Sequence, residues 1–161
     1  YSKMTIVGLR FFNVYGPNEF FKETTSSMVI QLGIQLLAGK SPRLFENSDR
    51  IFRDFIHIDD VVKANILACS PKKNGVFNVG LGKSRSFKDI SDILQSELGT
   101  NLEVDYFPNP YNSYQTNTLA DLTLSKESLG FDPKISLEEG IKSYVPEIKR
   151  IYNLIKDDQS K

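Results

Sequence analysis

The sequence predicts an α/β fold built on a mainly parallel sheet that is incomplete. Apolar runs typical of strands alternate with amphipathic helical patterns along the 161 residues, as in proteins whose strands are joined by helical crossovers. Glycine and proline lie between these segments, where turns are expected. Only about three or four runs are typical of strands, which is too few for a complete sheet covered on both faces.

The first predicted strand covers residues 6–15, with the sequence IVGLRFFNVY, and a Gly-Pro pair ends it. Polar side chains from Asn13 onward therefore lie at the carboxyl end of a strand. A largely buried helix follows, with Ser26 or Ser27 as its N-cap. Its apolar positions continue to residue 38, and Gly39 stops it.

Two extended segments, RLFE and RIFRDFIHI, flank a polar turn at residues 47–50. Asp59 or Asp60 then begins a helix with the sequence VVKANILAC, because acidic residues favour the amino terminus of a helix. The run GVFNVGLG is the next strand. Ser86 and Asp89 resemble a capping box for a helix that ends at Gly99.

The last third of the chain begins with the strand-like run LEVDYF, which two prolines end. Residues 111–121 are expected to be irregular. Ser136 and Glu139 form a full capping-box pattern for the final helix. Pro146 should kink or split that helix, because proline lacks the N–H group that a helix interior uses.

The composition excludes several classes of partner. Twenty basic and twenty acidic residues cancel, which gives no overall attraction to nucleic acid or to an anionic membrane. No apolar stretch reaches the roughly 20 residues that span a bilayer, so we expect a soluble, cytoplasmic protein. The single cysteine, Cys69, lies in the apolar run ANILACS, and we predict a buried thiol in a reducing compartment.

The single histidine, His57, lies in an alternating strand pattern. It has no partner at the spacing of metal ligands, and no nucleophile accompanies it. A structural histidine is therefore favoured over a zinc ligand or a triad base, and no metal site is predicted.

Four collinear segments carry a resemblance to a known family. GLRFFNVYGP, RDFIHIDDVVKA, GVFNVGLGKSRSFKDI and LGFDPKISLEEGIK resemble the carboxyl half of the extended short-chain dehydrogenases/reductases, the NAD-dependent epimerases and dehydratases. The resemblance covers almost the whole chain. The lysine after the YGP loop and the LFE turn are most similar to the ADP-L-glycero-D-manno-heptose 6-epimerases within that family.

The resemblance implies an isomerase of carbohydrate metabolism. These epimerases invert C6 of an ADP-linked heptose, a nucleotide-sugar used in lipopolysaccharide biosynthesis. Bound NADP accepts a hydride from C6 and returns it to the opposite face, so the net redox change is zero. Such chemistry needs a positioned nicotinamide and an acid/base group on the oxygen whose charge changes.

The resemblance also implies catalytic lysines. Lys22 would act as a second acid/base and would also lie near the cofactor, although a solvated loop lysine is the commoner fate of this residue type. Lys3 would be the lysine of the family's tyrosine–lysine pair, whose tyrosine would lie upstream of residue 1. Tyr1 is two residues from Lys3, so we do not assign it to the pair.

The remaining site residues follow from the same comparison. Asn13 would bind substrate at the strand end, with Val14 beside the nicotinamide or simply in the core. Thr24 and Gln31 occupy positions at which the family contacts substrate. An equally open interpretation is that both residues serve only to start the helix. The turn that would hold the adenosine or its ribose comprises Phe45, Glu46, Asn47 and Ser48.

Two further residues would contact the sugar nucleotide. Arg53 would bind the pyrophosphate through its guanidinium, and the rival interpretation is an ion pair with Asp54 or Asp59. Tyr114 would contact the substrate from the irregular segment, or else cover the core with its hydroxyl in water.

No glycine-rich strand-turn-helix motif for a dinucleotide occurs in the sequence. We therefore expect the chain to be a fragment or a deletion, the substrate-binding half of residues 1–161 without an amino-terminal NADP-binding half, inactive alone and a homo-oligomer when full length. The alternatives are a UDP-hexose 4-epimerase or sugar dehydratase, and a non-catalytic binding remnant.

Overall fold

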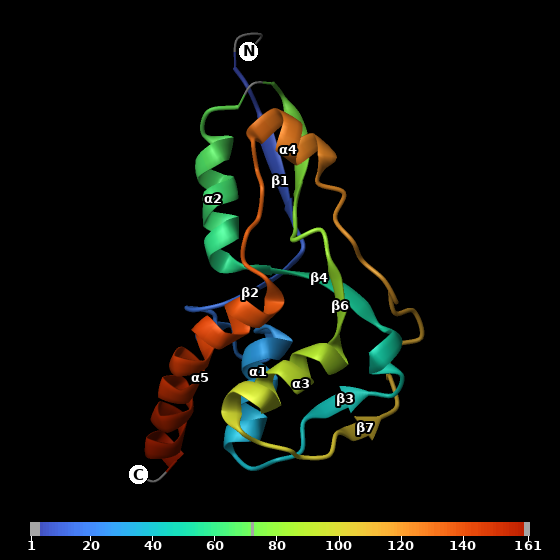
Figure 1. Cartoon of the computed structure of the whole chain (residues 1–161), viewed down its shortest axis with the longest axis vertical. Coiled ribbons are helices and arrows are strands. Elements are labelled where there is room, and N and C mark those ends of the chain that lie inside the picture. Colours follow the sequence, from blue (N-terminus) through green and yellow to red (C-terminus); the bar gives the residue numbers. More distant parts are fainter. Residues whose placement is uncertain (1–3, 72, 160–161) are drawn as a thin grey trace.

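The computed structural model describes residues 4–71 and 73–159, and Figure 1 shows their arrangement. In these ranges seven short strands alternate with five α-helices and two 3-10 helices. The strands are β1 (Val7–Phe11), β2 (Asn13–Tyr15), β3 (Arg43–Phe45), β4 (Phe52–His57), β5 (Gly75–Val79), β6 (Ser84–Ser86) and β7 (Asp105–Phe107). The helices are η1 (Phe20–Thr25), α1 (Met28–Leu37), η2 (Ser48–Arg50), α2 (Ile58–Ala68), α3 (Phe87–Leu98), α4 (Thr123–Leu129) and α5 (Leu137–Gln159).

The strands form three small sheets rather than one. β1 pairs with β5, β2 with β4, and β3 with β7, all in parallel, while β6 adds to β4 in the antiparallel direction. The predicted fold class is therefore confirmed, including the mainly parallel pairing and the incomplete sheet. The predicted number of strands was too low, because several strands have only three residues and leave no periodic signal.

The first predicted strand is in fact two strands in different sheets. Phe12 separates β1 from β2, and its N–H donates to the carbonyl of Val79 at 3.0 Å. This bond ends the pairing with β5, and the chain then crosses to pair with β4. One apolar run therefore links the two main sheets, which the sequence pattern alone could not reveal.

Two hydrophobic cores lie on either side of β4. One is built around α1, α3 and α5 and includes Phe55, Leu94 and Tyr144. The other lies between α2, β5 and α4 and includes Ile56 and Phe77. Figure 1 shows the corresponding two lobes, with β2, β4 and β6 between them.

Most of the predicted helix boundaries are confirmed. Ser86 caps α3 in a capping box with Asp89, and α3 ends at Gly99 in the left-handed conformation. Ser136 and Glu139 bond reciprocally before α5. The predicted start of α2 at Asp59 or Asp60 was one or two residues late, because α2 begins at Ile58 after the N-cap His57, whose ring accepts from the N–H of Asp59.

Three other predictions about the elements needed correction. Pro146 does not split the final helix, since α5 runs through it as one element. Helix α4 and strand β6 were not predicted. Cys69 is exposed rather than buried, because the face of α2 that carries Val62 and Ile66 is itself open, with these side chains 50% and 66% exposed.

A buried carboxylate on β4 ties three parts of the chain together. Asp54 is 0% exposed and accepts hydrogen bonds from the N–H groups of Leu81, Gly82 and Ala120 at 2.6, 2.8 and 3.0 Å. Burial raises the pKa of this carboxyl, and the three amide donors oppose the shift. Glycine at position 80 permits the close approach, since a Cβ there would lie 2.6 Å from that of Ala120.

None of the helices in the described ranges combines the length and the apolar character that crossing a bilayer requires.

Asp54→Asn should lower the free energy of unfolding by about 2–4 kcal/mol, because the amide nitrogen cannot accept and leaves buried N–H groups without a partner. Urea denaturation followed by circular dichroism measures the change. Asp92→Asn is the matched control, since Asp92 lies in an exposed ion pair with Lys88 and should cost below about 1 kcal/mol. Equal effects of the two substitutions would contradict this assignment.

The edge of β1 that faces away from β5 has no paired strand within residues 4–71 and 73–159. Ile6 and Phe11 beside it are 64% and 47% exposed. Because open apolar edges promote strand pairing between chains, we expect concentration-dependent self-association in analytical ultracentrifugation. Ile6→Lys should reduce it, whereas Leu154→Lys on α5 should not. If neither variant changes the self-association, another surface is responsible for it.

Candidate functional site

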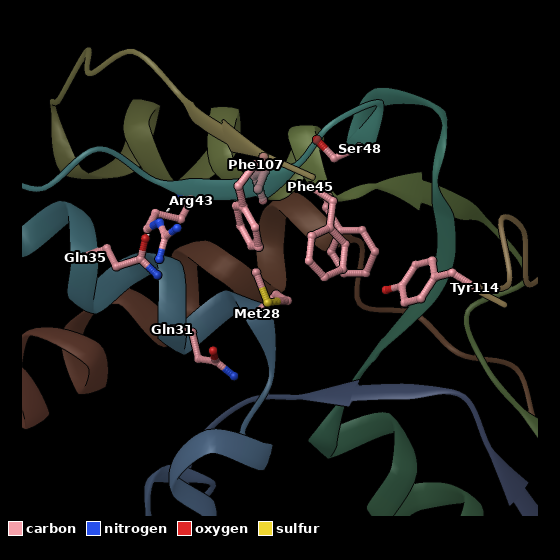
Figure 2. Close-up of a pocket in the computed structure, with 10 residues that line it drawn as sticks. Met28, Gln31, Gln35, Arg43, Phe45, Ser48, Phe107 and Tyr114 are labelled. Atoms are coloured by element: carbon pink, nitrogen blue, oxygen red, sulfur yellow. Dashed lines mark hydrogen bonds between the residues drawn. The ribbon is translucent and has the colours of Figure 1, made fainter. Parts of the chain in front are cut away.

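Two neighbouring cavities share part of their lining and are together called the groove here. The first, here called the lysine cavity, has a volume of ≈ 420 Å³ and lies beside Asn13, Val14 and Lys22. The second, the aromatic cavity, has a volume of ≈ 320 Å³ and is shown in Figure 2. Met28 and Phe87 line both of them. The groove therefore runs from the end of β2 to the turn after β3.

The aromatic cavity owes its shape to a cluster of four rings. Phe45 makes edge contacts with Phe107, Tyr111 and Tyr114 at centroid distances of 5.0, 6.1 and 5.6 Å. Tyr111 and Tyr114 stack on each other at 6.0 Å. The register of β3 with β7 brings Phe45 beside Phe107. Such a cluster offers apolar faces to a flat ligand, with the Tyr114 hydroxyl at its edge.

Arg53 joins this cluster from β4. It is 7% exposed, and its guanidinium lies over the rings of Tyr114 and Phe87, 5.0 and 5.8 Å from their centroids. It donates to the carbonyls of Phe52 and Gln115. Arg53 therefore holds the irregular segment against β4. It lines neither cavity itself, and its positive charge lies behind the rings of Tyr114 and Phe87, which do.

The rival interpretation of Arg53 as an ion-pair partner is wrong. Asp54 is occupied by three backbone amides, and Asp59 lies 3.6 Å from the ring of His57. Arg53 and Asp54 do not pair because they are neighbours on β4, and neighbouring side chains of a strand point to opposite faces.

Besides Arg43 and Tyr114, the polar side chains that line the aromatic cavity are Ser48, Gln31 and Gln35. Ser48 is 1% exposed, and its hydroxyl has no hydrogen-bond partner in the described part of the chain. The side-chain nitrogen of Gln31 donates to the carbonyl of Ser26 at 2.7 Å, so the amide oxygen of Gln31 points away from that carbonyl. Gln35 accepts from the N–H of Arg43 at 2.9 Å. These groups give an otherwise apolar cavity a few fixed hydrogen-bonding positions.

The lysine cavity gathers the residues predicted at the end of the first strand. Asn13 begins β2 opposite Phe55 of β4, and its side chain is exposed beside the cavity. Val14 is half-buried and packs on the second core. Lys22 comes from η1 and also lines a neighbouring cavity of ≈ 260 Å³ with Val14, Phe21 and Ile58. The arrangement places an amide and an ammonium group beside an apolar strand end.

Several predicted site residues lie away from the groove. Thr24 is exposed and faces a separate hollow beside Phe20 and Ile34. Glu46 and Asn47 are exposed and line neither cavity, and Asn47 takes a left-handed conformation with φ of 60°. Lys3 lies outside the described residues.

Sequence reasoning missed six residues of the aromatic cavity: Met28, Gln35, Arg43, Leu44, Phe87 and Phe107. Tyr111 was also missed, although it is 61% exposed next to Phe45. Each of these residues fits an ordinary helix or strand pattern, so the sequence carries little indication that it lines a cavity. Two aromatic residues after the prolines of PNP were the only local hint.

His57 has the structural role that its pattern predicted. It is 3% exposed, lies 5.4 Å from the ring of Tyr15, and accepts from the N–H of Asp59 at 3.3 Å. Burial lowers the pKa of His57, although Asp59 and Asp60 oppose the shift. Among the described residues, no three His, Cys, Asp or Glu side chains are grouped as metal ligands.

Residues 1–80 match the family described as the NAD dependent epimerase/dehydratase family. Solved structures of nucleotide-sugar epimerases superpose on the rest of the chain as well. The chain has the Rossmann-like α/β fold of the extended short-chain dehydrogenase/reductase epimerases.

Three solved epimerases illustrate the similarity. The ADP-L-glycero-D-manno-heptose-6-epimerase of Helicobacter pylori is 42% identical with a TM-score of 0.81, over 90% of this chain and 44% of that one. The UDP-glucose 4-epimerase of Thermotoga maritima, solved with UDP-glucose, is 33% identical with a TM-score of 0.83, over 90% and 46%. The UDP-glucuronic acid 4-epimerase of Bacillus cereus, solved with UDP-glucuronic acid and NAD, is 28% identical with a TM-score of 0.80, over 92% and 46%.

The chain therefore spans less than half the length of these epimerases.

Ser48→Ala should leave the free energy of unfolding unchanged or raise it by about 1 kcal/mol, because the buried hydroxyl has no partner to lose. Ser86→Ala is the matched control. Its hydroxyl accepts from the N–H of Asp89 at 3.0 Å, and losing this N-cap should cost about 1 kcal/mol. Thermal denaturation compares the two, and a clear loss in Ser48→Ala would show that the hydroxyl is bonded in solution.

Proposed function

We propose that this chain is the substrate-binding half of an ADP-L-glycero-D-manno-heptose 6-epimerase, which inverts C6 of an ADP-linked heptose for lipopolysaccharide core synthesis. The single observation that carries the proposal is the pair of neighbouring cavities, one lined by aromatic rings with Arg53 packed behind them and the other lined by Asn13 and Lys22. The 42% identity with the H. pylori enzyme supports the choice of substrate.

The aromatic cavity would receive the nucleoside. Stacking of a base on Phe45 and Tyr114 contributes about 1–3 kcal/mol per base in other proteins, and Ser48 offers a hydroxyl to the base or the ribose. Gln31 also lines the cavity and keeps a substrate-contact role in this proposal, as do Thr24, Glu46 and Asn47 if the neighbouring loops close on a ligand.

Arg53 would neutralise the diphosphate. Its guanidinium has a desolvated position between Tyr114 and Phe87, where a charge interacts more strongly than in water. Two of its N–H groups already bind backbone carbonyls, so the group is held in place before a ligand arrives. Preorganisation of this kind reduces the entropy lost on binding.

The sugar would then lie at the lysine cavity. Asn13 can donate and accept hydrogen bonds to sugar hydroxyl groups, and Lys22 can exchange a proton with the oxygen at the inverted carbon. Lys3 would complete the catalytic groups from outside the described residues.

A nicotinamide dinucleotide, NADP in this proposal, is the cofactor that the fold implies. The cavity lined by Val14, Phe21, Lys22 and Ile58 has an apolar wall against which a nicotinamide ring would pack. When bound, the cofactor supplies the hydride transfer. Val14 would pack against the ring, and Lys22 would orient the groups beside it.

The dinucleotide phosphates would need a glycine-rich turn that this sequence does not contain. We therefore place the NADP-binding half in a separate stretch of polypeptide that pairs with the open edge of β1. The assembled enzyme would be a cytoplasmic homo-oligomer, and the chain alone would be inactive.

A UDP-sugar epimerase is the second candidate, favoured by the 33% identity and the TM-score of 0.83 with the T. maritima enzyme.

Calorimetric titration of the chain with ADP-ribose, UDP-glucose and GDP-mannose separates the candidates. ADP-ribose should bind most tightly, and Phe45→Ala should weaken it about tenfold through lost stacking. Tyr106→Ala, on the strand beside it and outside the cavity, is the matched control. Tighter binding of UDP-glucose would favour the second candidate, and no nucleotide binding by a folded sample would contradict both.

A further inference from the structure

The loop that carries Lys22 is held by a buried carboxylate. Glu19 is 4% exposed. Its carboxylate accepts from the N–H of Gly16 at 3.3 Å, and from the N–H and the hydroxyl of Ser27, both at 2.7 Å. Gly16 follows β2 directly and Ser27 is the N-cap residue of α1. One side chain therefore clamps both ends of the loop formed by residues 16–27.

The loop does not hold this shape through ordinary backbone preferences. Asn18 and Glu23 have positive φ values of 70° and 50°, a conformation that residues with a side chain rarely adopt. Backbone strain of this kind persists only where the surroundings enforce it. The hydroxyl of Ser26 donates to the carbonyl of Glu23 at 2.6 Å inside the loop, and the three hydrogen bonds to Glu19 are the contacts that join its two ends.

Glu19 also lies close to Lys22 in the fold. Glu19 and Lys22 line the same two cavities. The N–H of Lys22 donates to the carbonyl of Glu19 at 3.0 Å, which sets the turn from which the lysine side chain emerges. On the opposite side, the carboxylate raises the pKa of the Tyr144 hydroxyl of α5, after the larger effect of burial.

The carboxylate is not placed to react with a substrate itself. Both of its oxygens accept hydrogen bonds from the loop, and it is almost fully buried. Its contribution to binding would act through the geometry of Lys22.

We propose that Glu19 is the positioning residue for Lys22, fixing the loop so that the ammonium faces the sugar end of the groove. This inference rests on the proposed function, because it takes the lysine cavity as the place of the sugar.

The experiment compares ADP with ADP-ribose as ligands of the whole chain, by calorimetry. In the proposed binding mode ADP would reach only the aromatic cavity and Arg53, whereas ADP-ribose would also extend toward Lys22. Glu19→Gln keeps the size of the side chain but replaces one acceptor oxygen with a donor. We expect about tenfold weaker binding of ADP-ribose, with binding of ADP unchanged. Unchanged ADP binding also shows that the variant is folded.

Two further variants control for general damage to the loop. Glu23→Gln changes an exposed carboxylate in the same loop and should leave both ligands unaffected. Ser27→Ala removes one donor to Glu19 from the opposite side, so a smaller loss for ADP-ribose alone is expected even if Glu19→Gln does not fold.

A double-mutant cycle gives the decisive readout. If Glu19 acts through Lys22, then Glu19→Gln should cause no further loss once Lys22→Met is present. Additive losses, or normal ADP-ribose binding in Glu19→Gln, would overturn the positioning role while leaving the proposed function intact. Failure of the unaltered chain to bind ADP, or Lys22→Met without effect on ADP-ribose, would overturn both.

Discussion

The hydrogen bonds between Asp54 and three backbone amides are the constraint on which the groove depends. They attach the β5–β6 turn at Leu81 and Gly82 to β4, and they attach the irregular segment at Ala120 to the same point. That segment carries Tyr114. Because the next side chain along β4 is Arg53, one strand both anchors the segment and supplies the cation that faces its aromatic residues.

The helices and their caps could be predicted from the sequence, since caps are local. Ser86 with Asp89, and Ser136 with Glu139, bond as their spacing indicated. The division of residues 6–15 into two strands could not be predicted, because it depends on the distant Val79. The exposure of Cys69 was also missed, since an apolar helix pattern does not say which face is covered.

The residues of the candidate site could also be predicted only in part from the sequence. Lys22, Phe45 and Tyr114 were named from a family resemblance, and the structure places them in two neighbouring cavities. Arg53, named in the same way, lies behind the ring of Tyr114 and lines neither cavity. Glu46 and Asn47 share a turn with Phe45 but point away from it. Residues contributed by unconnected elements, such as Gln35 and Phe107, meet only in the folded chain, so no local pattern could identify them.

Successive side chains of β4 pack into different hydrophobic cores, and this affects how the chain unfolds. Phe55 belongs to the core around α1, α3 and α5, while Ile56, the next residue, belongs to the core beside α2 and β5. Neither lobe keeps its packing if this strand detaches. Adjacent residues of β4 therefore couple the two lobes directly, and cooperative melting of both is the natural behaviour of such a chain.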